Sequence, residues 1–291
     1  MATIQAAATN VPQTSEKQIA LSLFSFGMIA LGILTVFSRE FAYDWQPVPA
    51  FPGREIVAGL CGLFMVVCSA ALLFRSTASI AARLMLPFLL AWLALKVPAL
   101  IFAPQIEGVW LNFGEIGTVF AGGLVLFAQR ARPEGSTFFA RLTGQQGVRA
   151  AQIMFGLSVF PIGLAHLVYS GITAAMVPSW LPFRLGLAYL TGVAQMACGV
   201  ALLFGFMPRV AALAEAFMCA LFAFLVWGPD TWFAAVPKFQ GSPPGFRFPL
   251  TAFLITWIVG CSALLLASAS ARSGSRFASG ARGDDATDRG L

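Results

Sequence analysis

The second half of the chain contains a few side chains that could bind a ligand or exchange a proton in otherwise apolar surroundings. His166 is the only histidine, and an imidazole titrates near physiological pH and can hydrogen-bond a quinone head group. Tyr169 and Arg184 flank the proline-containing loop that follows it. Gln195 and Glu215 stand inside long apolar segments, where polar groups are costly and are functional candidates by default. These five residues are the candidate ligand-binding site.

Each candidate also has a purely structural interpretation. His166 could hydrogen-bond the backbone of the loop, while Gln195 and Glu215 could form interhelical hydrogen bonds. Lys96 and Glu115 fall on consecutive apolar segments at similar depth. We expect them to form a structural ion pair, or Lys96 to extend towards the lipid head groups.

The sequence offers no catalytic residues and no metal site. A single histidine excludes bis-histidine ligation, so no haem is expected, and the cofactor is left unknown, with a quinone as one candidate. The five cysteines form no CxxC pair inside their apolar segments, which indicates small buried residues rather than a disulfide framework or a zinc site. No phosphate-binding, dinucleotide or zinc-protease motif is present, which favours a non-enzyme without deciding the question. The cysteines are Cys61, Cys68, Cys198, Cys219 and Cys261.

A membrane-embedded scaffold must position these side chains. Hydrophobic residues make up 58% and charged residues 10% of the 291 residues, and the mean hydropathy is +0.82. Soluble domains carry about 25% charged residues. So few polar groups cannot cover a water-exposed surface, and we predict an integral membrane protein in contact with the lipid bilayer. The net charge of +6 is then no sign of nucleic-acid binding.

Eight segments are long enough to span a membrane, which takes about 20 mostly apolar residues. They predict an all-α polytopic membrane protein with about eight transmembrane helices, arranged as two parallel four-helix bundles. Twelve lysines and arginines fall on the side that carries both termini and five on the other, so both termini are predicted to be cytoplasmic, in a cell membrane such as the bacterial inner membrane. The segments are 18–38, 56–74, 79–103, 113–129, 148–169, 186–206, 208–227 and 250–268.

The eight segments form two similar sets of four. The motif CSAALLF at 68–74 recurs as CGVALLF at 198–204, an offset of 130 residues. Because each set has an even number of spans, we expect both to have the same orientation, related by a pseudo-twofold axis along the membrane normal. In the first set, Phe37 falls at the position of His166, and Met65 at that of Gln195. Small residues shared by the second and sixth segments predict that these are the inner helices.

The predicted organisation follows from these repeats. Residues 18–129 form the first four-helix repeat and 148–269 the second, joined by a basic cytoplasmic linker over 130–147. Small and polar tails, 1–17 and 270–291, are expected to be disordered. The loop 170–183 is too apolar to be solvated and predicts an interfacial segment over the outer mouth of the second repeat.

The second repeat carries an ordered set of motif residues. They are Gly163, His166, Met176, Val177, Pro178, Trp180, Pro182, Gly192, Gly199, Gly205, Arg209, Ala211 and Ala212. In this order they resemble the DoxX family of small bacterial four-helix membrane proteins. There, a helix ending in Gly-x-x-His or Gly-x-x-Lys leads to a loop with prolines and a second helix containing Glu-x-x-x-Gly. The resemblance covers about residues 150–228, with a weaker copy over about 20–100.

The resemblance implies a role close to membrane redox chemistry, because family members are associated with quinone-linked oxidoreductases. It implies an accessory or scaffolding subunit of such a complex, with a quinone or lipid site at the outer face around His166, Arg184 and Gln195. The usual glutamate of the family is Gln195 here, which can hydrogen-bond but cannot carry a charge. An alternative expectation is a transporter that moves a small or apolar solute along the repeat interface, which Glu215 would suit.

Overall fold

The computed structural model describes residues 13–132, 138–229 and 245–280. Within these ranges the ordered elements are helices, and eight helical segments are long and apolar enough to cross a membrane. The predicted all-α, multi-pass membrane architecture is therefore confirmed. The elements are α1 (Gln13–Ser38), η1 (Tyr43–Trp45), α2 (Arg54–Leu72), α3 (Ala78–Ala94), α4 (Val97–Phe102), α5 (Glu107–Arg130), α6 (Phe138–Arg141), α7 (Gly144–Val168), α8 (Ser170–Met176), α9 (Arg184–Phe204), α10 (Pro208–Leu221), η2 (Phe222–Trp227) and α12 (Arg247–Gly280).

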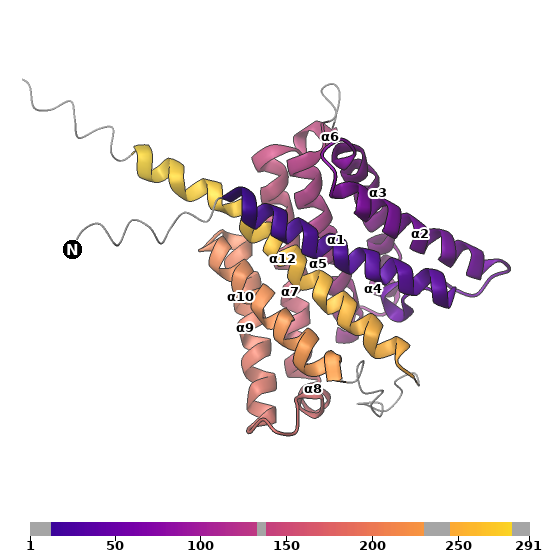
Figure 1. The fold of residues 1–291 in the computed structure, drawn as a ribbon. Helices are drawn as coiled ribbons and strands as arrows, with labels where there is room; N and C mark the ends of the chain where they lie inside the picture. The colour runs from indigo at the N-terminus through magenta and orange to yellow at the C-terminus, as the bar shows by residue number, and fades with distance from the viewer. Residues whose placement is uncertain (1–12, 133–137, 230–244, 281–291) are drawn as a thin grey trace, which may run out of the picture.

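The eight spans form a closed ring of neighbours. In the first set α1 packs against α2, α2 against α3, and α3 against α5, while α7, α9, α10 and α12 repeat this order. The two sets join through their fourth helices, because α12 packs along α1 and α5 packs along α7. Helices α5 and α12 also contact each other, and Figure 1 shows α12 beside α1 across the middle of the molecule. Each first helix therefore packs on the fourth helix of the other set.

The inner helices are α5 and α12, and the prediction that α2 and α9 are inner is wrong. In the most apolar stretch of each helix, 72% of the residues of α5 and of α12 are buried, whereas only 33% of those of α2 and of α9 are. The small residues of α2 and α9 do permit close packing, but on one face only. A Cβ atom on Gly62 would lie 2.7 Å from the carbonyl oxygen of Gly32, and one on Gly192 would lie 2.7 Å from that of Gly163. Other faces of these helices carry exposed apolar side chains such as Leu60.

Helix α5 begins at Glu107, before the predicted start of this span at residue 113. Its first turns contain Asn112 and Glu115, which lower the local hydropathy. Asn112 donates a hydrogen bond to the Gly108 carbonyl one turn back, and Glu115 accepts one from Trp45 of η1. These polar groups are satisfied within the protein, so the helix extends through a stretch that hydropathy alone excludes.

The burial pattern gives the alignment of the two sets. Helices α2 and α9, and likewise α3 and α10, share a burial pattern at the predicted offset of 130 residues. Helices α1 and α7 share theirs at an offset of 131, which aligns the fully buried Phe24 with Phe155. This offset places the buried Thr35 at the position of His166. The predicted counterpart, Phe37, is wrong because its side chain is 84% exposed on the lipid-facing surface.

Parts of the two predicted tails are helical. Helix α1 starts at Gln13, and α12 continues to Gly280. The start of α1 and the end of α12 lie at the same end of the molecule (Figure 1). Residues 1–12 and 281–291 of the tails, and 133–137 of the predicted linker, lie outside the described residues. We call the opposite end, formed by loops 39–53 and 169–183, the outer end, following the predicted orientation.

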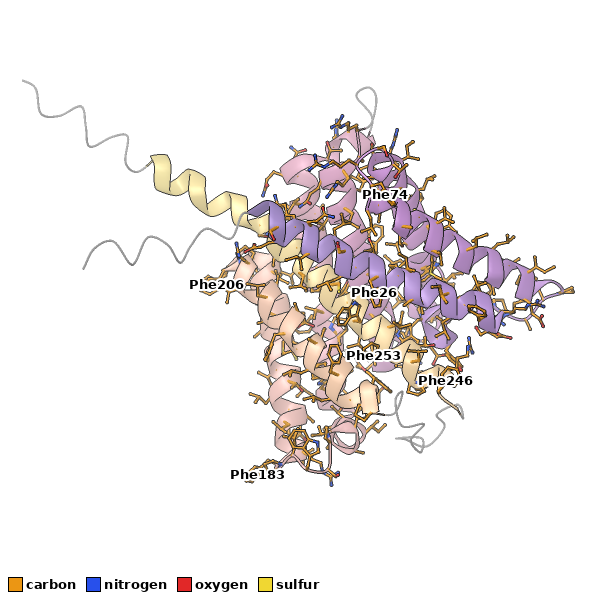
Figure 2. The ribbon with its side chains drawn as sticks, in the orientation of Figure 1. Phe26, Phe74, Phe183, Phe206, Phe246 and Phe253 are labelled. Atoms are coloured by element: carbon orange, nitrogen blue, oxygen red, sulfur yellow. The ribbon has the colours of Figure 1, made fainter. Side chains whose placement is uncertain are left out.

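Large apolar side chains point away from the bundle along its length. Phe26, Phe74 and Phe206 are each more than 60% exposed and project from the ribbon in Figure 2. Water-soluble proteins rarely expose apolar surface over such an area. This surface is suited to lipid chains.

Candidate functional site

Gln195 and Glu215 meet in the interior of the second set of helices. Gln195 Nε2 donates a hydrogen bond of 2.9 Å to Glu215 Oε1, and the Cys219 thiol donates to the same oxygen at 3.6 Å. The side chains of Gln195 and Glu215 are 1% and 0% exposed. At 1.5 Å rise per residue, Gln195 lies about 16 Å below the outer start of α9, close to the middle of the span. The pair is therefore deep in the membrane-spanning region.

The same two positions are apolar in the first set of helices. Met65 corresponds to Gln195 and Met85 to Glu215 at the offset of 130, and both methionines are fully buried. The fold thus accepts two apolar side chains at these positions, and the polar pair is a property of the second set alone.

His166 lies closer to the outer end, above the Gln195–Glu215 pair. Its Nδ1 is 3.0 Å from Thr191 Oγ1, one turn before Gln195 on α9. The Thr191 hydroxyl also lies within hydrogen-bond distance of the Leu187 and Ala188 carbonyls, at 2.9 and 3.1 Å. The imidazole also packs against the Phe222 ring, with the centroids 5.6 Å apart. His166 therefore connects α7 to α9 and η2.

Arg184 lies at the outer end, at the first residue of α9. It lines an open concavity of about 610 Å³ between α8 and the start of α9. The other lining residues are apolar or small: Gly171, Ala174, Ala175, Phe183, Leu185 and Gly186. No side chain caps α9, because Phe183 occupies the N-cap position in a left-handed conformation with φ of 53°. The concavity therefore combines apolar walls, a guanidinium group and uncapped backbone N–H groups.

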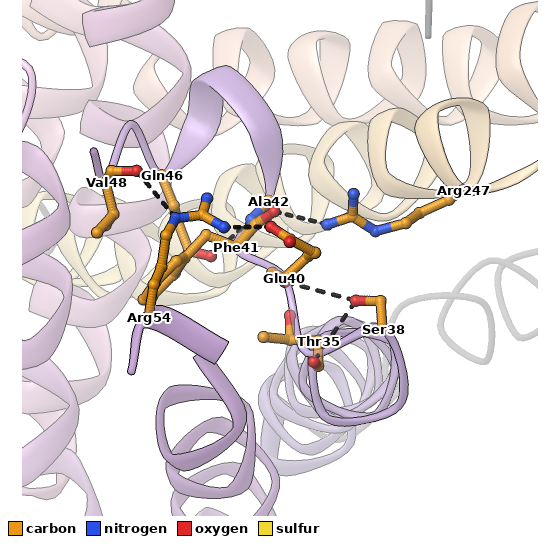
Figure 3. Close-up of polar contacts among 9 residues, drawn as sticks. All are labelled: Thr35, Ser38, Glu40, Phe41, Ala42, Gln46, Val48, Arg54 and Arg247. Carbon is orange, nitrogen blue, oxygen red and sulfur yellow. Dashed lines mark hydrogen bonds and ion pairs between the residues drawn. The ribbon is translucent and has the colours of Figure 1, made fainter. Parts of the chain in front are cut away.

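The corresponding arginine of the first set is already paired. Arg54 is the first residue of α2, at the offset of 130 from Arg184. It forms an ion pair with Glu40, donates a hydrogen bond of 3.2 Å to the Val48 carbonyl, and lies over the Phe41 ring (Figure 3). Within the part of the chain that the structure describes, Arg184 makes none of these contacts. One of two equivalent arginines thus stabilises a loop and the other is exposed beside a concavity.

Tyr169 belongs to a third environment. Its hydroxyl accepts a hydrogen bond of 3.1 Å from the backbone N–H of Gly108, at the start of α5. This bond connects the end of α7 to the other set of helices. The five candidate residues are therefore distributed over one interior pair, one connecting histidine, one interhelical contact and one surface arginine, rather than lining a single cavity.

Lys96 and Glu115 do not form the predicted ion pair. Among the described residues, the ion pairs within 4 Å join Glu40 to Arg54 and Glu16 to Arg209. Lys96 is buried between α3 and α4 and attracts Glu115 from a longer distance. The partner of Glu115 is instead Trp45, whose Nε1 donates a hydrogen bond of 2.7 Å to Glu115 Oε2.

Sequence reasoning missed two partners of the candidate residues, Thr191 beside His166 and Cys219 beside Glu215. Cys219 follows Glu215 by four residues, one turn of the same helix, so its spacing was a usable signal. Cys219 and the nearby Cys198 and Cys261 are buried free thiols. Within the described ranges, no three histidine, cysteine or acidic side chains are placed to hold a metal ion.

Comparison with known proteins finds a family match in the second half of the chain. Residues 155–262 match a family described as a domain of unknown function (DUF8561). The matched stretch runs from α7 into α12 and contains all of His166, Tyr169, Arg184, Gln195 and Glu215. No curated protein and no solved structure matches the chain.

Proposed function

We propose that this chain is an accessory membrane subunit that binds an amphiphile at the outer end of its second set of helices. The head group of the ligand presents oxygen acceptors, as a phospholipid phosphate or a quinone carbonyl does. The observation that carries the proposal is the concavity at α8 and α9, where Arg184 is exposed while its counterpart Arg54 is paired.

The chemistry of the concavity suits such a ligand. Arg184 can donate several hydrogen bonds to phosphate or carbonyl oxygens. The N–H groups at the start of α9 point to the same end and favour negative charge. Ala174, Ala175 and Leu185 provide apolar contacts for the part of the ligand next to the head group. The exposed Phe183 and Trp180 lie at this end and suit the lipid head-group region.

The resemblance to the DoxX family extends the proposal to a partner. A quinone-linked oxidoreductase in the same cell membrane would carry the redox centres, and this chain would hold lipid or quinone beside it.

Replacing Arg184 with glutamine is expected to weaken amphiphile binding by roughly tenfold, because a hydrogen bond to a charged group contributes about 1.5–3 kcal/mol. Native mass spectrometry of the protein released directly from membranes measures bound phospholipid, quinone and partner proteins together. The matched control is Arg39→Gln, an exposed arginine at the same end outside the concavity. Equal occupancy in Arg184→Gln and the wild type would contradict the proposal.

A second candidate function is transport of a small solute, favoured by one observation: the carboxyl group of Glu215 lies inside the span with no cationic partner among the described residues. Solute flux into vesicles containing the purified protein is then expected to be lost in Glu215→Ala. Flux should be retained in Glu55→Ala, which changes an exposed glutamate at the start of α2. Flux that persists in Glu215→Ala would exclude a transport role for this carboxyl group.

A further inference from the structure

We propose that Glu215 and Gln195 form a proton-binding site in the middle of the membrane-spanning region, in which a proton on Glu215 Oε2 is donated to Gln195 Oε1. The site is separate from the outer-end concavity and does not depend on a ligand there. It defines the chemical state of the carboxyl group that the transport alternative would use.

The hydrogen bonds around Gln195 and Glu215 leave two side-chain oxygen atoms without a donor. Glu215 Oε1 accepts from Gln195 Nε2 and from the Cys219 thiol. Gln195 Oε1 and Glu215 Oε2 are both buried and have no hydrogen-bond partner among the described residues. An ionised carboxylate and an amide oxygen can only accept, so neither can satisfy the other. One proton on Oε2 converts that atom into a donor and satisfies both.

The geometry of the pair permits this second hydrogen bond. The terminal torsions of glutamine and glutamate side chains are broad, so their planar ends turn at little cost. With Nε2 already 2.9 Å from Oε1, a small turn brings Glu215 Oε2 towards Gln195 Oε1. The carboxylic acid and the amide then form a reciprocal pair with two hydrogen bonds.

Among the described residues, no cationic side chain forms an ion pair that would neutralise an ionised Glu215. None of the ion pairs within 4 Å includes Glu215. The titratable groups close to it are thiols: Cys198 from α9, Cys219 from α10 and, beyond Cys219, Cys261 from α12.

The charged and titratable groups of the other neighbours are engaged elsewhere or lie further away. Arg149 of α7 donates to the Leu202 and Leu203 carbonyls, and His166 binds Thr191. Glu115 of α5 is also acidic and acts on Cys219 only from a distance. An added proton therefore neutralises the carboxyl group where no side-chain cation does.

The first set of helices shows that packing does not require this pair. Met65 and Met85 fill the corresponding positions and are fully buried. Polar side chains at these two positions thus add a site that can take up and release a proton without altering the helix arrangement. The O–H bond forms on Oε2 with a proton from hydronium of the aqueous phase, which becomes water, and release breaks the same bond and returns the proton, so no other reactant is needed.

Infrared spectroscopy of the purified protein in lipid nanodiscs tests the site directly. We expect the wild type near neutral pH to show a carboxylic acid C=O band that shifts in D₂O and is lost in Glu215→Gln. In Gln195→Met the band should persist at higher frequency, because the acid carbonyl loses the hydrogen bond from Nε2. The matched control Glu55→Gln should leave the band unchanged.

A double variant, Gln195→Met with Glu215→Met, copies the first set and keeps the test independent of single-variant folding. It should fold, with an unfolding temperature no lower than that of the wild type, and should lack the acid band. The proposal is overturned if Glu215→Gln removes only ionised-carboxylate bands, or if the double variant fails to fold. Loss of amphiphile binding in Arg184→Gln has no bearing on either result, so the two proposals fail separately.

Discussion

Replacing Gly122 with leucine is expected to separate the two central helices and to destabilise the protein strongly. Gly122 lies on α5 where it meets α12, and a Cβ atom there would be 2.7 Å from Ser262 Cβ and 3.1 Å from Ser262 Cα. No rotation of a terminal group relieves a contact with backbone and Cβ atoms. Overpacking typically costs about 1–3 kcal/mol and sometimes more, and we expect at least about 3 kcal/mol here because both helices must move.

The measurement is thermal or denaturant unfolding of purified Gly122→Leu in detergent micelles. Gly59→Leu is the matched control, because Gly59 lies inside α2 and nothing is within 4 Å of its added Cβ. That control should unfold close to the wild type. Equal stability of Gly122→Leu and Gly59→Leu would show that the contact between α5 and α12 does not hold the two sets of helices together.

Replacing either Phe155 or Phe24 with alanine is expected to cost about 3 kcal/mol. Both side chains are fully buried at equivalent positions of α7 and α1. Phe→Ala changes in protein cores cost about 3–5 kcal/mol, through lost transfer energy and an unfilled cavity. In a membrane the lipid chains reduce the transfer part, so packing loss dominates and the expected value is at the lower end of this range.

The control for this pair is Phe37→Ala, because Phe37 is 84% exposed at the outer end of α1. The unfolding free energies of Phe24→Ala and Phe155→Ala should be similar to each other and clearly lower than that of Phe37→Ala. A destabilising Phe37→Ala combined with a neutral Phe24→Ala would refute the offset of 131 residues between α1 and α7.

Hydropathy was sufficient to predict the fold class and the eight spans. Long apolar stretches without charges can be satisfied in lipid only as helices, so length and composition decide their structure. The same rule gave the wrong start for α5, since hydropathy assumes that a helix faces lipid. Helix α5 is mostly buried in protein, where Glu115 accepts a hydrogen bond from Trp45.

Helix pairing and the alignment of α1 with α7 could not be predicted from the sequence. Small residues on α2 and α9 mark a close contact, but they do not say whether the opposite face meets protein or lipid. The dipeptide Phe26–Gly27 recurs as Phe155–Gly156 at an offset of 129, the offset that pairs Phe37 with His166, whereas burial aligns Phe24 with Phe155. A single glycine is weak evidence of register because many helix faces accept it.

The candidate site was predictable in part. An isolated carboxyl and an amide in apolar segments identified Glu215 and Gln195, and the structure brings them into contact. The difference between Arg54 and Arg184 depends on the loops around them. Glu40 and Val48 lie where they can pair with Arg54, and sequence spacing carries no information on that geometry.

The packing of each first helix on the fourth helix of the other set has a consequence for how the chain is made. Helix α1 is synthesised before α12, which covers Gly27 and binds the Leu23 carbonyl through Trp257. Helix α1 therefore lacks this neighbour until α12 has been inserted. A single four-helix ancestor with the same contacts would have needed a second copy of itself, exchanging last helices as an intertwined dimer. Fusion of two such copies into one polypeptide makes that exchange intramolecular.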